Sequence, residues 1–425
     1  MNLETAFTMD TSSIKYGPGT THEVGEDMKA FGCKRVMVVT DKGLSELPPV
    51  TNAVASLKKA GLDAVVFDEV SVEPTDISFK QAISFASDGN FDGFVPVGGG
   101  SSIDTAKAAN LYSTYPADLL AYVNAPTGRA EKIPGRLKPL VAIPTTAGTG
   151  SETTGVAVFD FTEMHAKTAV SQRGLRPLLG ILDPENTRTL PPMAAAASGL
   201  DILSHAVESL TNLPYHQRPA PAEPSLRPSY QGSNPVSDIW ASRAIQMVAE
   251  NIVRVMDDPD DDDARAQMML AAAYAGIGFG NAGVQLPHAM SYPVSGMVRD
   301  YQPEGYPTSK PIVPHGIAVI LNAPAAFRFT GSAHPEKHRL AASLMGADVT
   351  DVGDEDIGDV LADVFIDLMK KTRVPNGLSA VGFHEDDLDD LVGGTLPQHR
   401  ITKLSPRPAD AEALRGIFKD AMRYW

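Results

Sequence analysis

The chain reads Gly93-Phe-Val-Pro-Val97 and then continues as Gly98-Gly-Gly-Ser-Ser-Ile-Asp104. A short apolar run is typical of a buried strand, and the residues after the glycines have the pattern of a helix start. Glycines between a strand and a helix leave backbone N–H groups bare, and a helix N-terminus attracts anions. This stretch therefore predicts an α/β fold that binds a nucleotide through its phosphates.

Similar apolar runs recur in the first part of the chain, at Arg35–Asp41, Asp63–Asp68, Leu140–Pro144 and Gly180–Pro184. Helical patterns lie between them, as at Val50–Ala60 and Asp76–Ser87. This alternation predicts a mostly parallel sheet with helices on both faces. Strand signals nearly vanish after about Asn186. We therefore expect a dinucleotide-binding α/β domain over residues 1–185 and an all-α domain over residues 186–425 that holds a metal and the substrate.

The bulk composition is that of a globular protein, with 425 residues, of which 43% are hydrophobic and 21% are charged. A formal net charge of −16 argues against a nucleic-acid or anionic-membrane partner. The single cysteine, Cys33, fits a reducing compartment. No apolar run is long enough to span a bilayer, and the first residues lack the features of a signal or transit peptide. We expect a cytoplasmic protein.

Four residues in the second half of the chain suggest a metal site. Asp201 and His205 are four apart in a helical pattern, and His288 and His315 each follow a proline. Three imidazoles and one carboxylate suit Fe²⁺ or Zn²⁺ and leave room for a substrate oxygen. Spacing alone leaves other interpretations open, because Ser198 could cap a helix ahead of Asp201 and a lone histidine is often a core residue.

A second turn, Pro144-Thr-Thr-Ala-Gly-Thr-Gly-Ser-Glu152, offers hydroxyl and N–H groups that could complete the nucleotide site. The alternative is an ordinary turn between a strand and a helix. Asp41 ends the first strand, where a carboxylate could accept hydrogen bonds from ribose and repel a 2′-phosphate. We expect Asp104 to lie in the first turn of its helix and to organise the glycine loop, since it would repel phosphate.

Two long segments without periodicity, Leu213–Asp238 and Arg299–Pro314, interrupt the helical domain. Loops of this length are uncommon unless they are functional or disordered, and we expect a lid or a pocket wall. The acidic run Asp257–Asp263 precedes a helical pattern at Ala264–Ala275. Its charges would complement the helix dipole, and the spaced ligands of a calcium loop are absent.

The two glycine motifs and the four metal-site residues resemble the iron-containing (group III) alcohol dehydrogenase family, from about Phe7 to the C-terminus. Within the family the chain is most similar to the hydroxyacid-oxoacid transhydrogenase subgroup. That similarity rests on four segments, Val72–Asp76, Gln231–Trp240, Gly276–Gly283 and Gly393–Gln398, and on the two long loops.

The resemblance implies the fold shared with dehydroquinate synthase, with a Rossmann-like N-terminal domain and an all-α C-terminal domain. It implies a divalent metal, iron or zinc, on Asp201, His205, His288 and His315. The residues it implies for NAD are Asp41, Gly99, Gly100, Ser101, Thr145, Thr146 and Thr149, with Asp104 beside them and with Lys167 and Leu182 near the ribose and nicotinamide.

One position departs from the family pattern. Many members carry a further histidine four residues after the third ligand, where this chain has Tyr292. A phenol can donate a hydrogen bond, but it titrates far above neutral pH and is a poorer proton shuttle than an imidazole. A catalytic role of Tyr292 is therefore expected to differ from that of the histidine.

The resemblance also implies a reaction. Hydride would pass from 4-hydroxybutyrate, or a similar hydroxy acid or alcohol, through NAD to 2-oxoglutarate, giving succinate semialdehyde and 2-hydroxyglutarate. Carboxylate substrates need cations, and the candidates in the two long loops are Arg218, Arg227, Arg299 and Lys310. The alternatives are an ordinary NAD-dependent alcohol dehydrogenase that releases NADH, a dehydroquinate synthase-like lyase and a non-catalytic metal-binding protein. We expect a homodimer or a higher homo-oligomer.

Overall fold

The computed structural model describes residues 2–164, 166–306 and 310–425. Contacts divide the chain into an α/β unit, Asp10–Leu190, and a helical unit, Pro191–Trp425, which also includes the N-terminal segment through Met9. The predicted boundaries placed that segment in the nucleotide domain. It belongs to the helical unit because the backbone N–H of Glu4 donates to the Arg218 carbonyl (2.8 Å) and the Glu4 carboxylate pairs with Arg227.

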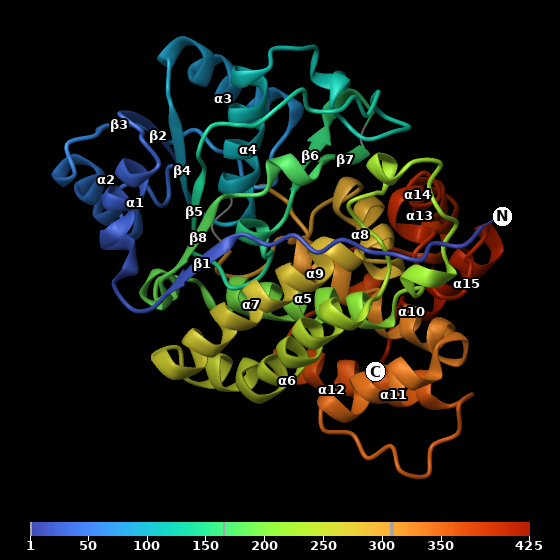
Figure 1. Ribbon diagram of the computed structural model, residues 1–425. Helices are drawn as coiled ribbons and strands as arrows, with labels where there is room; N and C mark the ends of the chain where they lie inside the picture. Colours follow the sequence, from blue (N-terminus) through green and yellow to red (C-terminus); the bar gives the residue numbers. More distant parts are fainter. Residues whose placement is uncertain (1, 165, 307–309) are drawn as a thin grey trace. The chain divides into compact units, whose positions relative to one another are not determined.

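The α/β unit is built on a six-stranded parallel sheet with the order β1-β8-β5-β4-β2-β3 (Figure 1). The strands are β1 (Ser13–Tyr16), β2 (Arg35–Val39), β3 (Asp63–Phe67), β4 (Gly93–Gly98), β5 (Val141–Pro144) and β8 (Leu179–Leu182). A separate antiparallel pair joins β6 (Val156–Phe161) to β7 (Ala166–Ser171). The parallel sheet is confirmed, although β1, β6 and β7 were not predicted.

Helices cover both faces of this sheet. Side chains of β2 alternate: Val36 and Val38 join a core with α1 (Val24–Ala30) and α2 (Pro48–Lys59), whereas Met37 and Val39 point to the other side. The second core includes apolar residues of α3 (Asp76–Gly89) and α4 (Gly100–Thr114). Alternate residues of a strand point to opposite faces of the sheet. A strand whose residues are all apolar is therefore buried on both faces, and the helices here cover both.

The strand order bears on the predicted nucleotide site. β3 and β4 lie on opposite sides of β2, so the direction of chain progression reverses between β2 and β4. In open α/β sheets ligands bind beyond the carboxyl ends of the strands at such a reversal. Asp41 follows β2 and Gly99 follows β4, so both predicted cofactor residues lie at this point.

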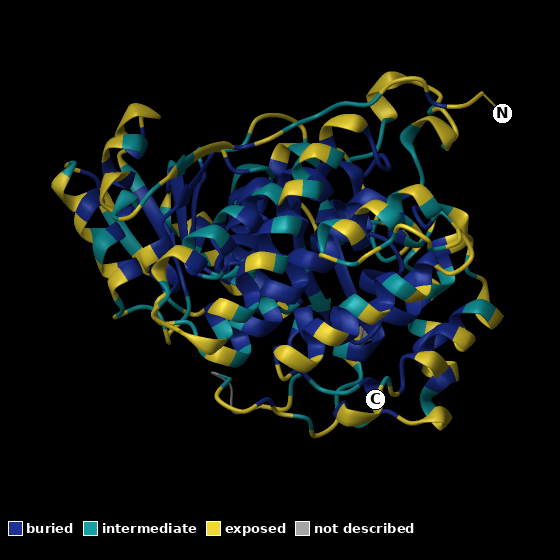
Figure 2. Ribbon diagram, turned by 90° about the horizontal axis from the view of Figure 1, so that it is seen from below, coloured by how far each residue is buried: buried dark blue, intermediate teal, exposed yellow. Residues whose placement is uncertain are grey.

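The second unit is helical, and its described residues contain no strand. Its helices are α5 (Pro192–Thr211), α6 (Pro235–Asp257), α7 (Asp262–Ala282), α8 (Leu286–Gly296), α9 (His315–Ile320), α10 (Ala323–Thr330), α11 (Pro335–Leu344), α12 (Ile357–Lys371), α13 (Leu388–Thr395), α14 (His399–Thr402) and α15 (Ala411–Asp420). Many have a buried inner face and an exposed outer one (Figure 2). Within the described residues, no helix combines the length and apolar character needed to cross a bilayer.

Two local predictions about helix starts have different outcomes. The Asp261 side chain accepts a hydrogen bond from the Ala264 N–H (2.9 Å), so the acidic run does cap α7. Ser198 lies inside α5, which begins at Pro192, so the alternative in which it caps a helix ahead of Asp201 is wrong. Part of the predicted loop Arg299–Pro314, residues 307–309, lies outside the described residues.

Candidate metal and cofactor sites

One face of helix α5 carries three buried polar side chains. Asp201, His205 and Glu208 follow one another at spacings of four and three, which place them on the same side of an α-helix. They are 2%, 4% and 0% exposed. Buried charged groups need partners, so this face must meet other polar groups.

Those groups come from α8 and α9. One potential ligand atom from each of Asp201, His288 and His315 lies within 4.8 Å of the other two. The Asp201 Oδ1 and His288 Nε2 atoms are 3.6 Å apart, and both are buried without a hydrogen-bond partner in the described part of the chain. Leaving such atoms unpaired costs free energy, whereas a cation between them would satisfy both. The three residues therefore fit a divalent metal.

His205 lies beside this group of three and is not part of it. Its ring stacks between Phe279 and His288, with ring centroids 3.9 Å and 4.4 Å away. Its Nδ1 atom lies 3.7 Å from Asp201 Oδ2 and is buried without a hydrogen-bond partner among the described residues. The structure thus brings all four predicted residues together, three of them closely and His205 at the margin.

Glu208 is a site residue that the sequence analysis missed. Its Oε1 atom lies 2.5 Å from His288 Nδ1, and its Oε2 accepts from the Gln285 backbone N–H at 2.6 Å. An ionised carboxylate only accepts, so Nδ1 carries the proton and Nε2 is left to face Asp201. This carboxylate–histidine pairing is the usual way to orient a metal-binding imidazole. Glu208 lies seven residues after Asp201, and this helical spacing is the sequence signal that could have identified it.

The charges of the site favour cation binding. Burial would lower the pKa of His288, but the Glu208 and Asp201 carboxylates outweigh burial and raise it to about 10. Burial lowers the pKa of His205 to about 3 despite the Asp201 charge, so this ring is neutral at pH 7. Burial alone would raise the pKa of Asp201, but the three histidines hold it well below its usual range. A metal would take the place of the His288 proton.

The two glycine motifs of the α/β unit lie against each other. The Thr145 N–H donates to the Gly98 carbonyl at 3.0 Å, and Gly99 forms the N-cap of α4. A Cβ atom on Gly100 would lie 2.8 Å from Thr149 Cγ2, so a larger residue would press into the second motif. Bare backbone at a helix start and nearby threonine hydroxyls form a cradle that suits a pyrophosphate.

We expected Asp104 to lie in the first turn of its helix. This expectation is wrong, because α4 begins at Gly100 and Asp104 falls in its second turn. Its carboxylate accepts from Ser151 Oγ (2.5 Å) and from the Val158 N–H (2.9 Å). It also pairs with the fully buried Lys107 at 3.3 Å. Asp104 therefore ties the glycine helix to the second motif by tertiary contacts and caps nothing.

The remaining predicted cofactor residues lie in the same unit. Asp41 Oδ1 accepts from the backbone N–H groups of Gly43 (2.8 Å) and Leu44 (3.1 Å), which fixes the turn after β2. Lys167 is buried and pairs with Glu73 (2.5 Å) and Asp160 (3.1 Å). Thr146 adjoins Gly99, the Ser101 hydroxyl accepts from Glu73 N–H (3.3 Å), and Leu182 ends β8.

The cations predicted for substrate binding are in different situations. Arg227 holds Glu4 through two hydrogen bonds (2.9 and 3.1 Å), and Arg299 is exposed and pairs with Asp387. These two are occupied by protein carboxylates. Arg218 is half-buried and Lys310 is exposed.

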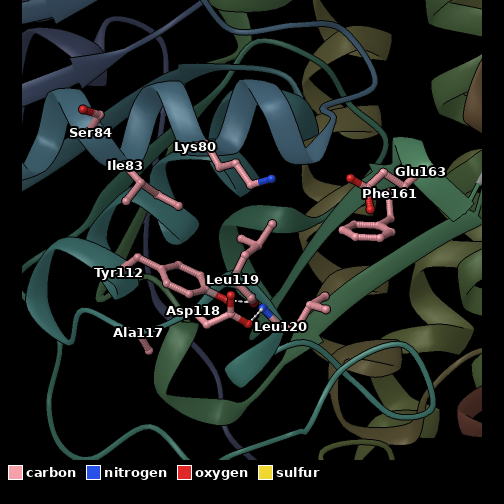
Figure 3. Close-up of a pocket in the computed structure, with 10 residues that line it drawn as sticks. All are labelled: Lys80, Ile83, Ser84, Tyr112, Ala117, Asp118, Leu119, Leu120, Phe161 and Glu163. Carbon is pink, nitrogen blue, oxygen red and sulfur yellow. Dashed lines mark hydrogen bonds between the residues drawn. The ribbon is translucent and has the colours of Figure 1, made fainter.

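A pocket in the α/β unit lies apart from all of these residues (Figure 3). Lys80, Tyr112, Asp118 and Glu163 are among the residues that line it. Two of its polar side chains have partners within the protein: Lys80 pairs with Asp76, and Asp118 accepts from the Leu120 N–H at 3.0 Å. None of the predicted site residues lines it.

Comparison with known proteins identifies the family. Residues 11–184 match the family described as iron-containing alcohol dehydrogenase, and residues 229–422 match the C-terminal part of the Fe-containing alcohol dehydrogenase family. The chain belongs to the iron-containing alcohol dehydrogenase family.

Curated relatives include a mitochondrial hydroxyacid-oxoacid transhydrogenase of Bos taurus, 51% identical over 99% of this chain and 91% of that protein. A probable mitochondrial hydroxyacid-oxoacid transhydrogenase of Dictyostelium discoideum is 50% identical over 99% and 80% of the two chains. The expectation of a cytoplasmic protein is wrong, because relatives of this similarity are named mitochondrial.

Solved structures share the fold. A 1,3-propanediol oxidoreductase superposes with a TM-score of 0.85 at 28% identity, over 98% of this chain and 100% of that one. An alcohol dehydrogenase from Oenococcus oeni gives 0.86 at 27% identity over the same shares. The predicted class, a Rossmann-like α/β part with a helical C-terminal part, is confirmed.

Proposed function

We propose that this enzyme is a hydroxyacid-oxoacid transhydrogenase. It oxidises 4-hydroxybutyrate, or a similar hydroxy acid, to the semialdehyde and passes the hydride through NAD to 2-oxoglutarate, which becomes 2-hydroxyglutarate. The observation that carries the oxidoreductase part is the facing pair of buried, unpartnered atoms, Asp201 Oδ1 and His288 Nε2. The transhydrogenase part is supported by relatives of that name at about half identity along nearly the whole chain.

The proposed metal ligands are Asp201, His205, His288 and His315, and iron is the metal that the family name suggests, with zinc as the alternative. A divalent ion, when bound, polarises a substrate oxygen, and NAD accepts and returns the hydride. Glu208 fixes the His288 tautomer, and Asp201 supplies the negative charge. Tyr292 lies one turn after His288 on α8 and is 7% exposed, so its hydroxyl is a candidate donor to the substrate.

In the proposed cofactor site, backbone at Gly99 and Gly100 and hydroxyls of the second motif bind the pyrophosphate. Thr145, Thr146 and Thr149 supply those hydroxyls, Ser101 adds one from the first motif, and Asp104 holds the two motifs together. Asp41 faces the ribose, and Lys167 and Leu182 line the rest of the site.

The decisive experiment mixes metal-loaded enzyme with 4-hydroxybutyrate and 2-oxoglutarate without free NAD. Many turnovers of succinate semialdehyde and 2-hydroxyglutarate in equal amounts are expected, because the cofactor is reduced and reoxidised in place. Turnover only after NAD is added, with NADH accumulating when the acceptor is omitted, would instead indicate an ordinary alcohol dehydrogenase. A lyase would transfer no hydride from a deuterated donor to the acceptor. Light scattering would test the expected homo-oligomer.

A further inference from the structure

Arg400, in helix α14, carries a polar atom that the protein leaves unsatisfied. Its Nη1 atom is buried and has no hydrogen-bond partner in the described part of the chain, although the residue as a whole is only half-buried. The guanidinium lies over the Tyr230 ring, with Cζ 4.8 Å from the ring centroid. Burial would lower the pKa of Arg400, but the phenol groups of Tyr230 and Tyr292 raise it. A buried donor on a permanent cation is costly unless an anion meets it.

Two further cations are linked to this residue through Lys403, which interacts electrostatically with both Arg400 and Arg218. The pKa of Lys403 is lowered by partial burial and by the like charges of Arg218 and Arg400. Burial lowers the pKa of Arg218, opposed by the charge of Glu4. The Glu4 carboxylate is already held by Arg227 through two hydrogen bonds. We call Arg218, Arg400 and Lys403 the cation cluster.

The cation cluster stands out because the chain as a whole has a formal net charge of −16. Among the residues that the structure describes, no carboxylate lies within ion-pair distance of any of the three. Three neighbouring cations without a paired acid repel one another, and an anionic ligand would relieve that repulsion.

The cation cluster adjoins the candidate metal site. Tyr292 and His288 are four apart on α8, so they share a face of that helix. Tyr292 in turn interacts with the Arg400 side chain. Tyr292 therefore links a proposed metal ligand, His288, to the unsatisfied guanidinium of Arg400, and all three residues lie in the helical unit.

We propose that the cation cluster, chiefly through the unsatisfied Nη1 atom of Arg400, binds the distal carboxylate of both the hydroxy-acid donor and the oxo-acid acceptor. This inference rests on the proposed function. In 4-hydroxybutyrate the hydroxyl carbon and the carboxyl carbon are separated by the same number of carbon–carbon bonds as the keto carbon and the distal carboxyl carbon of 2-oxoglutarate. One anion site at a fixed distance from the metal can therefore serve both half-reactions. An arginine suits this task because its planar fork matches a carboxylate.

The test compares Arg400→Met with the wild type, both as metal-loaded enzyme. We expect kcat/KM for 4-hydroxybutyrate to fall about tenfold to a hundredfold further than kcat/KM for 1-butanol, because only the acid uses the charged contact. Arg400→Lys should recover part of the loss, since it restores charge without the fork. Arg407→Met, which removes an exposed arginine outside the cation cluster, is the matched control and should keep the wild-type ratio.

A binding measurement separates recognition from catalysis. Butyrate, which carries the carboxylate but no hydroxyl, should raise the melting temperature of the wild type and of Arg407→Met but not of Arg400→Met. If Arg400→Met does not fold, Lys403→Met provides the same test at a less buried residue of the cation cluster, with a smaller expected loss. Equal losses with the acid and the alcohol, or an unchanged response to butyrate, would overturn the proposal. A wild type that never couples 4-hydroxybutyrate to 2-oxoglutarate would refute the proposed function, whatever the variants do.

Discussion

His288 and Glu208 meet through a 2.5 Å contact between Nδ1 and Oε1, although they are 80 residues apart in the chain. Glu208 also accepts from the backbone N–H of Gln285, the residue at the N-cap of α8. One buried carboxylate on α5 therefore fixes both the start of α8 and the orientation of the imidazole on it. The distance between the two residues along the chain means that the site exists only once α5 and α8 have packed.

Replacing Glu208 with glutamine should weaken metal binding about tenfold to a hundredfold, because the amide can still contact His288 but no longer supplies the charge that makes Nε2 a strong ligand. Competition with a chelator measures the affinity. Glu250→Gln, an exposed acid on α6, is the matched control, and His288→Ala gives the limit for a lost ligand. Wild-type metal affinity in Glu208→Gln would show that the pair serves folding alone.

Gly100→Ala should weaken NAD binding, because its Cβ would lie 2.8 Å from Thr149 Cγ2 and push the two glycine motifs apart. Titration of the protein with NAD measures the loss, which we expect to be about tenfold or more. Gly416→Ala in α15 is a suitable control, since no atom lies within 4 Å of a Cβ at that glycine. Unchanged NAD affinity in Gly100→Ala would place the pyrophosphate elsewhere.

Asp41 should make the enzyme prefer NAD over NADP, since its carboxylate would repel a 2′-phosphate. Asp41→Asn should narrow this preference mainly by improving NADP binding. The amide oxygen can still accept from Gly43 and Leu44, so the turn after β2 should persist. Dissociation constants for both cofactors provide the measurement. If the wild type binds NADP as tightly as NAD, Asp41 does not face the ribose.

The strands that are buried on both faces could be predicted from the sequence, because a continuous apolar run is recognisable without knowing which strands pair with it. It was not sufficient for β1, where three of four residues are exposed and the pattern is polar. The chain reversal beside β2 also required the structure, since strand order depends on tertiary packing.

The same distinction applies to the sites. The metal-site residues were predicted from spacing and family motifs, and Glu208 had a helical spacing that could have revealed it. Arg400 had no local signal, because its significance comes from Tyr230 and Tyr292, which are far away in the sequence. Arg227 and Arg299 looked like free cations because their acidic partners, Glu4 and Asp387, are also far away in the sequence.

The Glu4–Arg227 pair should make the helical unit sensitive to acid. The hydrogen bond from Arg227 lowers the pKa of Glu4 from 4.5 to about 2, against the opposing effect of burial. A carboxyl whose pKa is depressed on folding stabilises the protein above its unfolded pKa, and this contribution is lost as the pH falls from about 4.5 towards 2. The Glu4 side chain is only 8% exposed, so solvent screening is weak.

Glu4→Gln should therefore lower the free energy of unfolding at pH 7 by about 1–3 kcal/mol, which is typical of a lost charged hydrogen bond. Both tryptophans, Trp240 and Trp425, lie in the helical unit, so urea unfolding followed by their fluorescence reports on this part of the chain. Between pH 5 and pH 3 the difference between wild type and Glu4→Gln should shrink, because the wild-type carboxyl progressively loses its advantage. Glu250→Gln should behave like the wild type throughout. A difference that stays constant with pH would mean that the pair contributes through packing and not through the Glu4 charge.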